Sequence, residues 1–128
     1  MGQTRLLIID EHEAVRKALV SRLQQTGQMQ VVGSTSSWEE GILQIQTLHP
    51  HVVLLETKRS DGAGLETCRR IARNHPETAI VVLTSYEDEK ERQEAFMAGA
   101  TGYILKDIDS AELLQEILNC CPNERPAN

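Results

Sequence analysis

Three carboxylates stand directly after apolar runs of this sequence. Residues 6–9 run into Asp10 and Glu11, and residues 52–55 run into Glu56. An unbroken apolar run is typical of a strand buried on both faces, and a polar residue after it would lie at the carboxyl edge of a parallel sheet. Carboxylates gathered at such an edge repel one another or attract a cation, and hard oxygen ligands suit Mg²⁺. The pattern therefore predicts a small acidic site.

Two further polar residues follow later apolar runs. Thr84 comes after residues 79–83, and Lys106 comes after residues 103–105. A lysine ammonium at the same edge can pair with Glu56 or contact a phosphoryl oxygen, and a hydroxyl can contact the same oxygens. A metal, a carboxylate, a hydroxyl and an ammonium together suit phosphoryl transfer onto a carboxylate. Any one acid alone is more simply a solvated loop residue, but polar residues at the ends of four strands favour a site.

The elements that must position these residues alternate along the chain. Five apolar runs, the second of them at residues 30–32, are each followed by a segment with helical spacing. Strands that alternate with helices imply a parallel sheet with right-handed crossovers. The predicted fold class is α/β, a doubly wound, flavodoxin-like (βα)5 arrangement with strand order 2-1-3-4-5. In that order the first and third strands are neighbours, so Asp10, Glu11 and Glu56 meet in one crevice.

Cap and stop signals predict where the helices begin and end. Ser37 with Glu40 fits a capping box, as does Ser36 with Glu39, and Asp109 precedes the last helix. Gly27 and Gly99 are predicted stops. The apolar face of the first helix is predicted from its spacing. Its members are Val15, Ala18, Leu19 and Leu23.

Composition bounds the remaining possibilities. The 128 residues fit one domain, predicted over residues 1–119, with residues 120–128 as a disordered tail or the start of an interdomain linker. The formal net charge of −6 argues against a nucleic-acid surface. No run has the length of a membrane span or a signal peptide, so we expect a cytoplasmic location with no membrane contact and three reduced cysteines.

Longer motifs resemble those of one family. The chain is similar to the receiver domain of a two-component response regulator, of the NarL/LuxR-type branch. The resemblance spans about residues 4–119 and rests on five motifs. These are Leu-Ile-Ile-Asp-Glu-His (7–12), Val-Val-Leu-Leu-Glu (52–56), Gly-Leu-Glu (64–66), Val-Leu-Thr-Ser-Tyr (82–86) and Ala-Gly-Ala-Thr-Gly-Tyr-Ile-Leu-Lys-Asp (98–107).

The resemblance implies a role for each residue of the predicted site. It makes Asp10 and Glu11 the acidic pair that binds Mg²⁺, together with Glu56 and the backbone carbonyl of Lys58. It places Glu56 at the phosphoacceptor position. It implies three further residues that respond to or contact the phosphoryl group. These are the switch hydroxyl Thr84, the switch aromatic Tyr103 and the phosphoryl-contacting lysine Lys106.

This sequence departs from the family at the acceptor itself, where Glu56 replaces the usual aspartate. The added methylene moves the carboxylate outward by about 1.5 Å, and a misplacement near 1 Å can slow a positioned reaction by roughly a hundredfold. Residues 58–61 also lack the family's usual apolar-Pro-Gly stretch, and Lys58 adds a cation beside the acids. We therefore expect an atypical receiver with weakened Mg²⁺ binding and inefficient phosphorylation, in which Glu56 partly imitates the phosphorylated state.

The resemblance also implies partners and leaves one competing class. The partners would be a histidine kinase and an output domain, a helix-turn-helix transcription regulator in the parent protein, with no nucleic-acid binding by this chain itself. A homodimer would use either the fourth helix, fifth strand and fifth helix or the first and fifth helices. The alternative is a small Mg²⁺-dependent α/β phosphatase, although a haloacid-dehalogenase-type enzyme would need aspartate where His12 stands. The preferred interpretation is a signalling module and not an enzyme.

Overall fold

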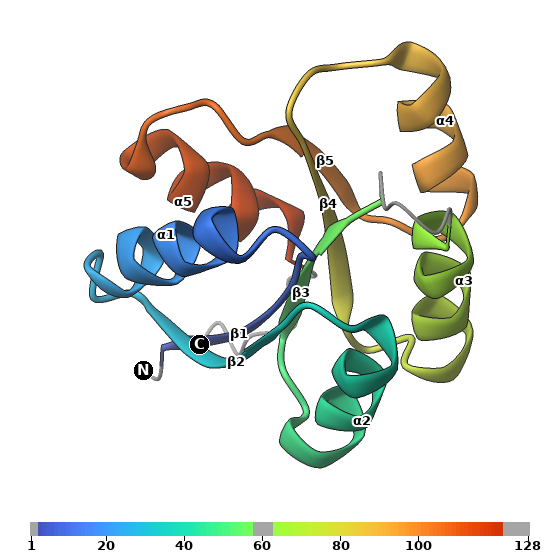
Figure 1. The fold of residues 1–128 in the computed structure, drawn as a ribbon, viewed down its shortest axis with the longest axis horizontal. Coiled ribbons are helices and arrows are strands. Elements are labelled where there is room, and N and C mark those ends of the chain that lie inside the picture. The colour runs from blue at the N-terminus through green and yellow to red at the C-terminus, as the bar shows by residue number, and fades with distance from the viewer. Residues whose placement is uncertain (1–2, 58–62, 122–128) are drawn as a thin grey trace.

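The computed structural model describes residues 3–57 and 63–121 and contains one five-stranded parallel sheet between two layers of helices (Figure 1). The strand order is β2-β1-β3-β4-β5, which confirms the predicted topology. The strands are β1 (Thr4–Ile9), β2 (Met29–Thr35), β3 (Val52–Glu56), β4 (Ala79–Thr84) and β5 (Gly102–Leu105). The helices are α1 (Glu13–Gln24), α2 (Trp38–Leu48), α3 (Gly64–Asn74), α4 (Glu89–Met97) and α5 (Ser110–Cys120).

Two apolar clusters lie on opposite faces of the sheet. Helices α1 and α5 cover one face, and α2, α3 and α4 cover the other (Figure 1). Alternate residues of one strand belong to different clusters: Leu54 packs with α1 and α5, whereas Val53 and Leu55 pack on the opposite side. Side chains of a strand point to its two faces in turn. Burial on both faces therefore explains why β3 and β4 are unbroken apolar runs.

Two predicted helix caps, Ser37 and Asp109, are confirmed, and Asp88 is a third cap that was not predicted. The side chains of Ser37, Asp88 and Asp109 accept backbone hydrogen bonds at the beginnings of α2, α4 and α5. Asp88 caps two amides, those of Lys90 and Glu91, at 3.0 and 3.4 Å. These caps satisfy amides that have no partner inside the helix, and they fix α4 and α5 where they leave the carboxyl edge of the sheet.

Two local predictions differ from the structure. Leu19 and Leu23 are buried as expected, but Ala18 is exposed and the Val15 side chain keeps 37% of its surface accessible. Val15 lies in the first turn of α1, which begins beyond the carboxyl end of β1 and so has little sheet beneath it. Strand β2 is longer than residues 30–32 and contains Gly33, where a Cβ atom would lie 2.5 Å from Gln44 Oε1 and 2.9 Å from Leu7 Cδ1.

The carboxyl ends of β1, β3, β4 and β5 meet at one edge of the sheet. The register pairs Ile9 with Leu55 and Glu56 with Leu83, so the residues that follow these strands are neighbours in space. Among the described helices, none is long and apolar enough to cross a membrane.

Candidate functional site

Lys106 links two of the predicted carboxylates. Its Nζ atom lies 2.8 Å from Asp10 Oδ2 and 2.9 Å from Glu56 Oε1. The side chains of Asp10 and Glu56 are 2% and 4% exposed, and that of Lys106 is 12% exposed. Three residues from the ends of β1, β3 and β5 thus form one buried charge cluster, which we call the acidic pocket.

The charges of this pocket stabilise one another. Burial alone would raise the pKa of Asp10, but hydrogen bonds from Lys106 and from the backbone of His12 outweigh it and leave the pKa below its ordinary value. Burial likewise opposes the charged form of Lys106, yet hydrogen bonds to Asp10 and Glu56 hold its pKa above the ordinary value. Opposite charges at hydrogen-bonding distance favour the ionised form of each partner. Asp10 and Lys106 are therefore both charged at neutral pH.

The backbone at the end of β1 is held in place on several sides. The His12 N–H donates to Asp10 Oδ1 at 2.9 Å, and His12 Nδ1 lies 3.1 Å from the same oxygen. Arg16 donates to the Asp10 carbonyl at 2.8 Å, and the Asp10 N–H donates to the Thr35 carbonyl at 3.0 Å. The His12 side chain is exposed, and its ring faces the aspartate.

The predicted Mg²⁺ ligands are only partly gathered. Asp10 and Glu56 converge, but they converge on the Lys106 ammonium. Glu11 follows Asp10 and is half-buried. Lys58, whose carbonyl is the fourth predicted ligand, lies outside the described residues. Within residues 3–57 and 63–121, no group of three or more His, Cys, Asp or Glu side chains is arranged to hold a metal ion. Carboxylate donors suited to Mg²⁺ are present, and an ammonium already neutralises two of them.

Thr84 is buried at the end of β4, and its hydroxyl donates to the Tyr86 carbonyl at 2.7 Å. Its own carbonyl accepts the Lys106 N–H at 2.8 Å. The predicted switch hydroxyl therefore stands beside the acidic pocket and is engaged by the loop that leads to α4.

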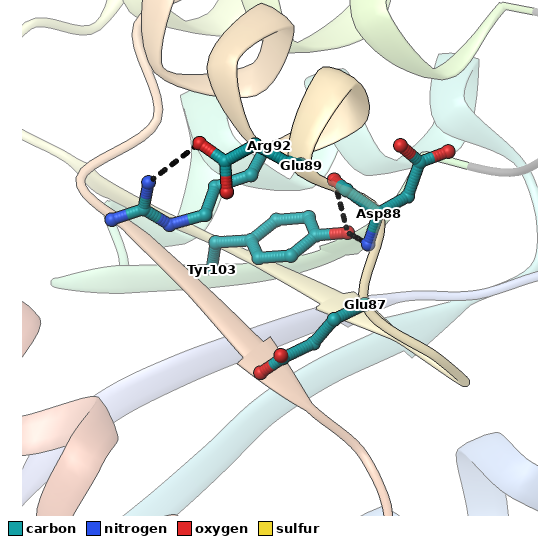
Figure 2. A pocket seen from close by; sticks show the side chains of 5 residues that line it. All are labelled: Glu87, Asp88, Glu89, Arg92 and Tyr103. Carbon is teal, nitrogen blue, oxygen red and sulfur yellow. Dashed lines mark hydrogen bonds and ion pairs between the residues drawn. The ribbon is translucent and has the colours of Figure 1, made fainter.

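Tyr103 is held by the first turn of α4. Its hydroxyl donates to Glu91 Oε1 at 2.6 Å and accepts the Asp88 N–H at 3.2 Å. Burial, followed by the hydrogen bond to Glu91, raises the pKa of Tyr103 to about 12. Tyr103 also forms one wall of a pocket of about 390 Å³ (Figure 2). The pocket is lined by Glu87, Asp88, Glu89, Arg92 and Tyr103.

Sequence reasoning missed the role of Glu91. Within the acidic stretch from Glu87 to Glu94, Glu91 is buried, with 8% of its surface exposed. Its Oε2 accepts the Thr57 hydroxyl at 2.8 Å, so it contacts the residue directly after Glu56. The spacing from Glu91 to the buried Ala95, four residues later, was the available signal, because such positions share one helix face.

The family assignment follows from comparison with known proteins. A family model for the response regulator receiver domain matches residues 6–118. The chain belongs to this family. The receiver is 34% identical over 113 residues to the DNA-binding transcriptional activator DevR/DosR of Mycobacterium tuberculosis, covering 88% of this chain and 52% of that protein. It is 35% identical over 113 residues to the response regulator GacA of Pseudomonas protegens, covering 88% and 53%.

Solved structures agree with this assignment. The receiver matches the signal receiver domain of the putative response regulator NarL from Mycobacterium tuberculosis with a TM-score of 0.86 at 22% identity, covering 94% of this chain and 97% of that one, which supports the fold. A LuxR-family response regulator from Aurantimonas sp. SI85-9A1 matches with a TM-score of 0.85 at 25% identity, covering 92% and 84%.

These matches place the receiver in two-component signalling and in the NarL/LuxR-type branch, as the motifs indicated. They lend no support to the phosphatase alternative. The receiver spans about half the length of the curated relatives it matches.

Proposed function

We propose that this receiver works as an atypical signalling module, which Glu56 and Lys106 hold in one state without phosphorylation. The ion pair of 2.9 Å between Glu56 Oε1 and Lys106 Nζ carries the proposal. By the family resemblance, Lys106 is the residue that would contact a phosphoryl oxygen. The longer glutamate side chain, with its extra reach of about 1.5 Å, delivers its own oxygen to that ammonium.

Phosphorylation would be inefficient for two reasons. The Glu56 carboxylate is displaced from the position of the family's aspartate, and such displacement weakens a reaction that depends on positioning. Its oxygen is also engaged by Lys106, in a pocket where Asp10 and Glu56 are almost fully buried. One carboxylate has less charge and fewer acceptor oxygens than a phosphoryl group, so Glu56 would imitate the phosphorylated state only in part.

Mg²⁺ binding belongs to the same proposal. Asp10, Glu11, Glu56 and the Lys58 carbonyl would hold the ion, which when bound neutralises phosphoryl oxygens. Because Lys106 already pairs with Asp10 and Glu56, a cation would have to compete with an ammonium for the same oxygens. Weak Mg²⁺ binding is the result that we expect.

We propose the partners on the same basis. They are a histidine kinase, which would act poorly on Glu56, and an output domain or partner protein that reads the state of the receiver. The domain would act in the cytoplasm and catalyse no reaction of its own on other substrates. A homodimer would form through α4, β5 and α5 or through α1 and α5.

The test compares the receiver with Glu56→Asp. Each protein is incubated with acetyl phosphate and Mg²⁺, and its intact mass is measured. We expect the parent to gain no stoichiometric phosphoryl group and Glu56→Asp to gain one. Glu94→Asp, the same chemical change on α4, is the matched control and should behave as the parent. A stoichiometric phosphoryl group on Glu56 of the parent would overturn the proposal.

A further inference from the structure

Glu91 is a buried carboxylate that the predicted pocket does not include. Charged side chains are seldom buried unless hydrogen bonds or ion pairs compensate their loss of water. Here Glu91 Oε1 accepts the Tyr103 hydroxyl at 2.6 Å, and Oε2 accepts the Thr57 hydroxyl at 2.8 Å. Hydrogen bonds to an ionised carboxylate are shorter and stronger than neutral ones, so Glu91 holds both hydroxyls firmly.

These contacts join three elements through one side chain. Thr57 directly follows the last residue of β3, Glu91 lies in α4, and Tyr103 lies in β5. Asp88, the capping residue of α4, adds its N–H to the Tyr103 hydroxyl at 3.2 Å. The first turn of α4 thus holds the tyrosine hydroxyl through two groups, while Glu91 also reaches the tip of the strand that carries Glu56.

We propose that Glu91 is a positioning residue that couples the tip of β3, through Thr57, to the placement of Tyr103 and so to the pocket beside α4 (Figure 2). When the Thr57 hydroxyl shifts, the carboxylate of Glu91 must move to keep the hydrogen bond to Oε2. Both carboxylate oxygens move together because the group is rigid. Its other oxygen then moves relative to Tyr103, which is a wall of that pocket. The coupling goes beyond the proposed function, because it depends on Thr57 and holds for either carboxylate at position 56.

The first experiment reads Tyr103 directly at neutral pH. The protein has two tyrosines, so in a Tyr86→Phe background Tyr103 is the only source of tyrosine ring resonances in an NMR spectrum. Thr57→Val removes the hydroxyl while keeping the side-chain shape. We expect it to shift the Tyr103 ring resonances when Glu91 is present and to leave them unshifted when Glu91→Met has removed both hydrogen bonds. Equal shifts with and without Glu91 would overturn the proposal.

A pH titration separates positioning from simple packing. In the same background, ultraviolet absorbance of the phenolate reports the pKa of Tyr103. Glu91→Met should lower that pKa from about 12 toward the ordinary phenol value near 10. Glu91→Gln removes the charge but keeps an acceptor and should give a value between these two. Glu94→Gln, the matched charge change on the same helix, should leave the pKa unchanged. An unchanged pKa in Glu91→Met would contradict the role assigned to Glu91.

The reverse measurement decides the question should Glu91→Met fail to fold. Tyr103→Phe removes the hydroxyl at the other end of the chain of hydrogen bonds. We expect the methyl resonance of Thr57 to shift in this variant, and to shift less when Glu91→Gln has weakened the link. A Thr57 methyl that does not respond to Tyr103→Phe would also overturn the proposal. None of these readouts involves a phosphodonor, so they stand apart from the test of phosphorylation.

Discussion

Lys106 and Asp10 are joined by an ion pair of 2.8 Å across 96 positions of the chain. Glu56 contacts the same ammonium at 2.9 Å, so one cation serves two buried anions. Removing one partner of a buried ion pair leaves an uncompensated charge, which costs more than the pair itself contributes.

Lys106→Met should therefore destabilise the receiver at neutral pH by about 3 kcal/mol. Two carboxylates with almost no exposed surface would then lose the ammonium that they share. Urea unfolding measures the change in the free energy of unfolding. Lys90→Met, at an exposed position of α4, is the control and should cost well under about 1 kcal/mol. Similar losses in the two variants would argue against the charge cluster.

Stability should fall in acid because the pKa of Asp10 is lowered in the folded state. A group of this kind contributes stability above its unfolded pKa, near 3.8, and loses it as the pH falls through its lower folded value. In Lys106→Met the main cause of the lowering is gone while burial, which raises the pKa, remains, so this variant should lose less stability in acid than the parent does. Urea midpoints measured from pH 7 to below pH 3 compare the two losses.

At alkaline pH the contribution of Lys106 to stability is lost as the pH rises, the opposite direction to that of Asp10. The pKa of Lys106 is raised above 10.5 in the folded state, so its contribution is complete below 10.5 and disappears as the pH rises through the folded value. Lys106→Met removes this contribution and should show a shallower loss of stability above pH 10. The parent and the variant are compared by thermal unfolding across that range, and parallel curves would count against the raised pKa.

Mg²⁺ should bind more tightly once the ammonium is gone. Lys106→Met removes the ammonium that Asp10 and Glu56 share, and a gain of 1.4 kcal/mol in binding corresponds to about tenfold in affinity. We expect at least that gain over the parent by isothermal titration calorimetry. Lys90→Met should leave the affinity unchanged. An affinity for Mg²⁺ in Lys106→Met no higher than in the parent would show that the ammonium does not compete with the ion.

Gly99 should tolerate a side chain poorly. Its φ of +112° lies in a region that favours glycine, and a Cβ atom there would lie 2.4 Å from the Ala72 Cβ of α3. We expect Gly99→Ala to destabilise the receiver by about 2 kcal/mol. Gly27→Ala is a matched control, because φ is +75° and a Cβ atom would meet nothing within 4 Å; it should cost about 1 kcal/mol. Thermal unfolding measures the loss of stability in each variant. Equal losses would show that the close approach of α3 to Gly99 adds no cost.

The meeting of Asp10, Glu56 and Lys106 could be predicted from the sequence because each follows an unbroken apolar run. If those runs form parallel strands, their carboxyl ends lie at one edge of the sheet. The strand order 2-1-3-4-5 then places the first and third strands side by side. The burial of Glu91 could not be predicted so easily. Seven of the eight residues from Glu87 to Glu94 are charged, and helical spacing marks Glu91 as inward only when Ala95 is known to be buried.

The exposure of Val15 was also unpredictable from spacing alone. Periodicity identifies one face of a helix, but the length of that face that meets the sheet depends on where the neighbouring strands end. Here β1 ends at Ile9 and α1 begins at Glu13, so the first turn of α1 extends past the edge of the sheet on which the rest of the helix packs.

The order of the three pocket residues along the chain has a consequence for synthesis on the ribosome. Asp10 and Glu56 emerge first, and β1 and β3 are neighbours in the sheet, so a nascent chain can bring the two acids together before Lys106 has been made. Until the ammonium arrives, their repulsion opposes the docking of these strands. Closure of the sheet edge is thus tied to the arrival of β5, which brings the Lys106 ammonium to the two pocket acids.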